Sequence, residues 1–158
     1  MSSWIKTDLA LLIDRIESGG RPKGGVSEDS GDVPSLGGEN IRRDGGLELV
    51  SVKRVPRSFF EKMSKGVLSF GDVLINKDGA NTGKVGLYES EFPKASINEH
   101  LFLLRGNPDK LNQRFLYYLL LSQFGQAEIR SKISTRFQTL LVAFSPSSNT
   151  SVSSKKTH

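Results

Sequence analysis

The sequence predicts a single α+β domain, built on a twisted and mostly antiparallel sheet with a few short helices packed against it. Three observations support this prediction. An apolar run at residues 73–75 enters a polar turn with two glycines and leaves it in a second run at residues 85–88, which is typical of a β-hairpin. Residues 95–104 form another strand-like run, and residues 111–124 place apolar side chains at helical spacing.

The N-terminal half contains one expected helix and two expected strands. Thr7 and Asp8 can cap a helix whose apolar positions continue to Ile16. Residues 32–36 should be extended, because a residue that precedes proline avoids helical backbone angles. Residues 47–52 alternate apolar and polar side chains well enough to predict a strand.

Two helices and a single core are expected in the rest of the chain. Pro56 fits the first turn of a short helix at residues 58–63, and residues 127–133 would extend the helix at 111–124. The expected core positions of these helices are Phe59, Phe60, Met63, Phe115, Leu116, Leu119 and Leu120. The strands would supply Val73, Leu74, Ile75, Val85, Leu87, Ile97, Leu101 and Leu103 to the same core.

The turn between the two hairpin strands is the best candidate for a functional surface. It presents four polar side chains from a short, rigid backbone: Lys77, Asn81, Thr82 and Lys84. None of them is a good nucleophile or metal ligand, but their amide, hydroxyl and ammonium groups are good partners for phosphates and base edges. The turn therefore indicates recognition of a nucleic acid rather than catalysis.

The same segment looks like a phosphate-binding loop, but its spacing argues against nucleotide hydrolysis. That motif places four residues between its glycines and a serine or threonine after its lysine. Here three residues separate Gly79 from Gly83, and Val85 follows Lys84. The chain also continues into a strand, not into a helix whose N-terminus could hold a phosphate. The two glycines are explained by a hairpin turn that needs positive φ.

Composition excludes several kinds of site. The chain has no cysteine, which rules out disulfides, thiolate catalysis and cysteine zinc sites. It has two histidines, of which His100 is expected to be structural or solvent-facing. No apolar run reaches the roughly 20 residues of a membrane span, and no signal stretch is visible, so we expect a cytoplasmic protein without membrane contact. The net charge is +5, and residues 41–84 carry nine basic and five acidic side chains, a modest footprint for a polyanion.

Other candidate DNA contacts precede the turn. Arg21 and Lys23 lie in a glycine-rich loop at residues 19–25, which could equally be a plain connector. Further candidates follow along the chain: Asn40, Arg42, Arg43, Lys53, Arg54 and Arg57. The arginines and Lys53 would contact phosphates, whereas asparagine and lysine on the turn can read adenine and guanine edges.

Several short motifs stand in an order that resembles one known family. They lie at residues 18–22, 32–36, 40–41, 65–68, 71–75, 78–85, 97–100 and 115–120. Together they resemble a target recognition domain from the specificity subunit of type I restriction-modification enzymes, in a single-domain or truncated form. The resemblance spans about Trp4 to Ile133. Each motif alone is weak, and the ordered set carries the resemblance.

The resemblance implies a protein that reads double-stranded DNA and has no catalytic residues, metal or cofactor of its own. Such subunits carry two recognition domains, separated by long helical spacers, and each domain reads half of a split site. Modification subunits, which bind S-adenosylmethionine, methylate adenine, and restriction subunits use ATP and Mg²⁺ to translocate and cut DNA. This chain departs from the pattern, because it has one recognition domain and lacks the long spacer helix.

Two alternatives stay open at this point. The chain could be a nonfunctional, truncated remnant, since it lacks the spacer helix that should hold the modification subunits. Residues 1–138 would form the recognition domain, and the serine-rich residues 139–158 read as a disordered, frameshifted tail. It could also be a nuclease in its own right, with Asp72, Asp78 and Lys84 as the metal-binding and catalytic groups. Against the nuclease, Asp72 follows a glycine at a strand entry, where it is expected to cap backbone amides.

Overall fold

A computed structural model of the chain describes residues 7–133. The expected tail at residues 139–158 and the N-terminal Trp4 lie outside the described residues. Within them the α+β class is confirmed, but the strands form two sheets rather than one.

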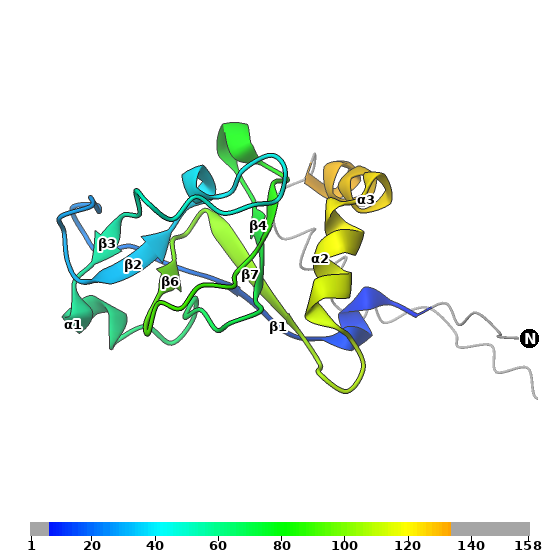
Figure 1. Ribbon diagram of the computed structural model, residues 1–158, viewed down its shortest axis with the longest axis horizontal. Coiled ribbons are helices and arrows are strands. Elements are labelled where there is room, and N and C mark those ends of the chain that lie inside the picture. Colours follow the sequence, from blue (N-terminus) through cyan, green and yellow to red (C-terminus); the bar gives the residue numbers. More distant parts are fainter. Residues whose placement is uncertain (1–6, 134–158) are drawn as a thin grey trace, which may run out of the picture.

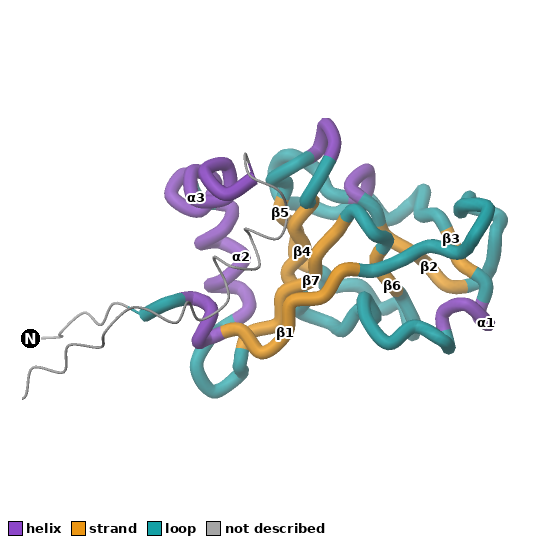
Figure 2. The backbone as a smooth tube through the Cα atoms, turned by 180° about the vertical axis from the view of Figure 1, so that it is seen from behind, coloured by secondary structure: helices purple, strands orange, loops and turns teal. Residues whose placement is uncertain are grey.

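The main sheet has four antiparallel strands in the order β1-β7-β4-β5. Its strands are β1 (Ile13–Ser18), β7 (Leu101–Gly106), β4 (Val73–Asn76) and β5 (Val85–Leu87). The second sheet, in the order β3-β2-β6, consists of β3 (Arg54–Val55), β2 (Val33–Leu36) and β6 (Ser96–Ile97), and its β2–β6 pair is parallel. Figures 1 and 2 show the main sheet between this smaller sheet and the helices α2 (Gln113–Leu121) and α3 (Gln123–Ile133).

Side-chain alternation along the main sheet separates two cores, where one core was expected. Ile75 of β4 lies opposite Phe102 of β7, and both pack toward α2 with Leu116. The next pair, Leu74 and Leu103, points to the other face and packs on the smaller sheet. Because both faces are covered, these strands read as continuous apolar runs instead of alternating ones. The strand positions expected to be buried are buried or half-buried, as predicted.

The β4–β5 hairpin is confirmed, together with the reason for its glycines. Its connection contains a short 3₁₀ helix, η3 (Gly79–Asn81). Gly79 and Gly83 have φ of 72° and 89°, which lie in the left-handed region that side chains with a Cβ rarely occupy.

The prediction of a helix at residues 7–16 is wrong beyond the first turn. Only a 3₁₀ helix forms, η1 (Leu9–Leu12), and the Asp8 side chain accepts a hydrogen bond from the Ala10 N–H at 3.1 Å. The chain then turns into β1, where Ile16 pairs opposite Leu104 of β7. Pairing with a distant strand and burial on the helix-covered face outweigh the local helical spacing.

Two expected strands are also corrected. Residues 47–52 are irregular, with a single bridge from Leu47 to Ile41, and Val50 is 93% exposed. The run at residues 95–104 is divided between β6 and β7, which belong to different sheets. The break falls at Asn98, whose side chain accepts a hydrogen bond from the His100 N–H at 2.9 Å and so supports a turn.

The expected helices exist but are shorter and differently buried. α1 (Arg57–Phe60) is a single turn after Pro56, and its expected core residues are only half-buried. α2 buries Leu116 and Leu120, whereas Phe115 is 60% exposed and was wrongly placed in the core. At Ser122 the backbone becomes extended, so α3 is a separate helix rather than an extension of α2.

Asn112 is expected to stabilise α2 as its N-cap. Its side-chain oxygen accepts a hydrogen bond from the Phe115 N–H at 3.1 Å. Replacing Asn112 with alanine should lower the free energy of unfolding by about 1 kcal/mol, because one N–H at the helix start loses its partner. Urea denaturation measures this change, with the exposed neighbour Lys110→Ala as control. Equal effects of the two substitutions would contradict the capping role.

Candidate nucleic-acid interface

The β4–β5 turn meets two other segments along one edge of the molecule. The Lys77 N–H donates to the His100 carbonyl at 3.0 Å, which joins the turn to the segment between β6 and β7. The side chain of Asn76 lies directly against Gly38, in the 3₁₀ helix η2 (Gly38–Asn40). In Figure 1 the cyan η2 and the green η3 lie near each other along the upper edge.

A series of close polar contacts brings the glycine-rich loop to this edge. Arg21 Nε lies 2.7 Å from Glu99 Oε1, and the same oxygen lies 3.5 Å from His100 Nε2. His100 Nδ1 in turn lies 2.7 Å from Asp78 Oδ1. The structure therefore brings Arg21 next to the turn, and His100 is a partly exposed structural residue, as expected. Lys23, in the same loop, is exposed.

The four candidate side chains of the turn divide into two pairs. Lys77 Nζ lies 3.1 Å from Ser18 Oγ and 5.2 Å from the centre of the Phe102 ring, so its ammonium is directed over the sheet. The Thr82 hydroxyl donates to the Gly79 carbonyl at 2.6 Å and closes the 3₁₀ turn. All four residues are partly exposed, but Lys77 and Thr82 are engaged in these contacts, so Asn81 and Lys84 are better placed for contact with a ligand.

Arg42 and Arg43 are carried by a tight turn at residues 42–46. The Arg42 N–H donates to the Gly46 carbonyl at 2.8 Å, and the Gly45 N–H donates to the Arg42 carbonyl at 3.1 Å. Arg42 Nε also lies 3.3 Å from Asp44 Oδ1, on the surface. Both arginines are exposed, and both are therefore accessible to phosphates.

Asn40 does not fit a direct DNA contact. It is 2% exposed, its Oδ1 accepts from the Gly37 N–H at 2.9 Å, and its Nδ2 donates to the Glu48 carbonyl at 2.9 Å. Its amide therefore holds the loop before β3 in place, which explains why that segment is not a strand. Asn40 was a candidate DNA contact, but burial assigns it a structural role.

Lys53 is partly neutralised. Its Nζ lies 3.0 Å from Glu39 Oε1, and both side chains are about half exposed. Partial burial acts to raise the pKa of Glu39, but hydrogen bonds from the backbone and from Lys53, with the charges of Lys53 and His100, lower it overall. Glu39 stays ionised at neutral pH, and its negative charge partly offsets the attraction of Lys53 for a phosphate.

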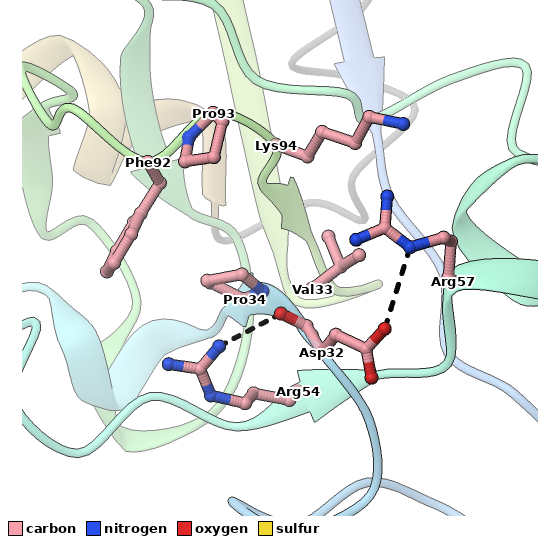
Figure 3. A pocket seen from close by; sticks show the side chains of 8 residues that line it. All are labelled: Asp32, Val33, Pro34, Arg54, Arg57, Phe92, Pro93 and Lys94. Carbon is pink, nitrogen blue, oxygen red and sulfur yellow. Dashed lines mark hydrogen bonds and ion pairs between the residues drawn. The ribbon is translucent and has the colours of Figure 1, made fainter.

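Arg54 and Arg57 belong to a second basic region, beside α1 and the smaller sheet. They line a hollow of about 300 Å³ with Pro34, Phe92 and Pro93 (Figure 3). Arg54 Nη1 donates to the Asp32 carbonyl at 2.9 Å, and Arg57 Nε lies 3.5 Å from the Asp32 carboxylate. Lys94 completes this region. Lys94 was not expected from the sequence, because a single lysine after a proline does not by itself indicate a binding site.

The positions of Asp72 and Asp78 argue against the alternative that the chain is a nuclease. Asp72 is 1% exposed and makes two 2.7 Å hydrogen bonds with Arg105, while its Oδ2 also accepts from the Ser69 N–H at 2.8 Å. Asp72 thus caps a backbone amide, as expected, and does not face solvent. Asp78 pairs with His100. Among residues 7–133, no three histidine or acidic side chains form a group that could hold a metal ion.

No helix in this part of the chain is long and apolar enough to cross a membrane.

Comparison with known proteins identifies the fold. No protein-family profile and no curated protein sequence matches the chain. The HsdS subunit from Thermoanaerobacter tengcongensis is similar in structure, with a TM-score of 0.51 and 19% identity over 86% of this chain and 37% of its own. A chain of a type I restriction-modification system, from a structure on complex assembly and conformational transition, has a TM-score of 0.51 and 20% identity. The match covers 86% of this chain and 38% of that chain. The type I S subunit from M. genitalium has a TM-score of 0.50 and 15% identity, over 84% of this chain and 29% of its own.

These likenesses define the class of fold. The described chain has the α+β fold found within type I restriction-modification specificity subunits. More particularly, the resemblance to a target recognition domain, first made from the motifs, is confirmed at the level of the fold. The chain spans less than half of the length of the chains it matches.

Proposed function

We propose that this chain is a DNA target recognition module, the specificity component of a type I restriction-modification system. The observation that carries the proposal is the structural likeness to S subunits over 86% of the chain. The site supports it, because Arg21, Arg42, Arg43 and Lys84 lie on loops with exposed or partly exposed side chains, and Asn81 lies in the short 3₁₀ turn η3. Such a module would bind phosphates with the arginines and read bases from the β4–β5 turn.

The partners of the proposed module are double-stranded DNA and the modification and restriction subunits of the same system. The chain itself would carry no cofactor and catalyse no step. S-adenosylmethionine, ATP and Mg²⁺ would belong to the partner subunits, which would methylate adenine and cleave DNA in the cytoplasm. The chain matches less than half of a whole S subunit, so a second recognition domain would have to come from another part or another chain.

Binding to duplex DNA is expected to be weak and to fall with salt. One recognition domain forfeits the effective concentration that a second, linked domain provides. Replacing both Arg42 and Arg43 with alanine should weaken binding to all sequences alike and reduce the slope of log affinity against log salt, by roughly one for each phosphate contact that is lost. Fluorescence anisotropy with a randomised duplex pool at two salt concentrations measures both effects.

The exposed Lys110→Ala, outside the candidate interface, serves as the control for a general loss of charge. No binding by the parent chain at low salt would contradict the proposed function and favour a nonfunctional remnant. Co-purification with a modification subunit would test the assembly part of the proposal separately.

A further inference from the structure

Two helix side chains reach across to the two loops that carry the candidate DNA contacts. The Tyr117 hydroxyl, on α2, donates to the Gly45 carbonyl at 3.0 Å. The Gln126 side chain, on α3, donates to the Gly83 carbonyl at 3.1 Å and to the Leu120 carbonyl at 2.9 Å. One contact therefore fixes the turn of Arg42 and Arg43, and the other fixes the turn of Asn81 and Lys84.

The contacts of Tyr117 with Gly45 and of Gln126 with Gly83 are made at glycines in tight backbone turns. Gly45 is buried with φ of 90°, and a Cβ added there would come within 2.4 Å of the Tyr117 hydroxyl oxygen. Gly83 has φ of 89°, and its N–H donates to the Asn76 carbonyl at 2.8 Å while its carbonyl receives Gln126. Both contacts use backbone carbonyls, so they hold the path of each loop without depending on the exposed side chains.

The hydroxyl of Tyr117 is suited to donate a hydrogen bond at neutral pH. Partial burial raises the pKa of Tyr117, and the neighbouring Tyr118, Asp44 and Glu89 act in the same direction, against a smaller opposite effect of Arg42. The phenol therefore stays protonated at neutral pH.

The helices also hold the far end of the β4–β5 hairpin. The Gln113 side chain donates to the Gly71 carbonyl at 2.7 Å, just before β4, and Arg114 Nη2 lies 2.6 Å from Glu89 Oε1, just after β5. With Gln126 at the turn, the hairpin is held to α2 and α3 at both ends. A shift of the helix pair would therefore move the whole hairpin.

We propose that Tyr117 and Gln126 are positioning residues that set the two loops in a fixed relation to each other, and that the DNA sequence preference depends on that relation. This inference rests on the proposed function. A bidentate base contact tolerates only small displacements, so a reading side chain is effective only on a loop that is held firmly. The two residues would act on DNA through the loops and not by touching it.

Amide hydrogen exchange on the full chain tests the positioning without any DNA. Tyr117→Phe should speed exchange of the bonded amides of Arg42 and Gly45, and Gln126→Met that of Gly83, each by roughly fivefold. The controls are Tyr118→Phe, which removes an exposed hydroxyl one residue away, and Gln123→Met, at an exposed position on α3. Amides of β7 serve as the reference for global unfolding in every variant.

Binding measurements then test the link to DNA. The ratio of affinities for the preferred duplex and for a random duplex should fall several-fold in Tyr117→Phe and Gln126→Met, with the salt slope unchanged, because no phosphate contact is lost. Lower stability alone would reduce both affinities in the same proportion. Unchanged exchange in the two loops, or faster exchange with an unchanged ratio, would overturn the inference. If the parent chain bound no DNA, the proposed function would fail, and the exchange result alone would decide whether these residues hold the loops.

Discussion

Replacing Arg105 with methionine is expected to destabilise the domain by about 3 kcal/mol, the lower end of the range for a broken buried ion pair. The variant leaves the Asp72 carboxylate, which is 1% exposed, with the Ser69 N–H but without its two 2.7 Å bonds to the guanidinium. The lower end applies because the Arg105 side chain is 28% exposed, so water could partly replace it. The carboxylate raises the pKa of Arg105, so the guanidinium stays charged over the whole accessible pH range.

Chemical denaturation of three variants measures this effect and its cause. Arg114→Met breaks a surface pair with Glu89 and should cost less than about 1 kcal/mol. The double variant Asp72→Asn with Arg105→Met removes both charges and should recover part of the stability lost in Arg105→Met. If Arg105→Met were as stable as Arg114→Met, the pair could not be an important support of β4.

The parts of the fold that are visible in the sequence are those fixed by neighbouring residues. The β4–β5 hairpin follows from two apolar runs, a short turn and glycines at 79 and 83, which take the positive φ that the turn requires. α2 follows from its helical spacing and from Asn112 at its start. Each of these signals lies within a few residues of the element that it specifies.

The errors come from contacts between distant parts of the chain. Residues 13–18 form a strand because β7 offers them an edge, and no local pattern reveals that pairing. Residues 47–52 alternate like a strand, but the buried amide of Asn40 takes the carbonyls of Glu48 and Ser51. The helical spacing of apolar residues predicts that Phe115 is buried, but no neighbouring element among the described residues covers it and it is exposed.

The residue types nominate candidates for the site, but they do not give its geometry. The polar turn drew attention to Lys77, yet only the folded structure places Ser18 and Phe102 beside its ammonium. Arg21 reaches the turn through Glu99, which no spacing rule connects with it. Tyr117 lies within the helix motif at residues 115–120, but its hydrogen bond to Gly45 joins distant segments that no local pattern connects.

Replacing Asn81 or Lys84 with alanine should change which duplex is preferred, at roughly 1–3 kcal/mol if a bidentate base contact is lost. The turn itself should survive both substitutions, because its bonds here are made by the backbone. The Asn81 carbonyl accepts from the Lys84 N–H at 3.2 Å, and the Lys84 carbonyl accepts from the Asn76 N–H at 2.9 Å. A change in preference would therefore reflect the missing side chain and not a collapsed loop.

Selection from a randomised duplex pool, followed by affinity measurements at two salt concentrations, separates base readout from phosphate contact. Alanine at position 81 should leave the salt slope unchanged, since asparagine carries no charge, whereas the double Arg42 and Arg43 variant should reduce the slope and keep the preference. Lys84→Ala removes a charge as well, so a lower slope without altered preference would assign it to phosphates alone. If the Asn81→Ala and Lys84→Ala variants selected the same sequences as the parent chain, the β4–β5 turn would have no part in reading DNA. Recognition would then have to be sought in the loops around Arg42 and Arg21.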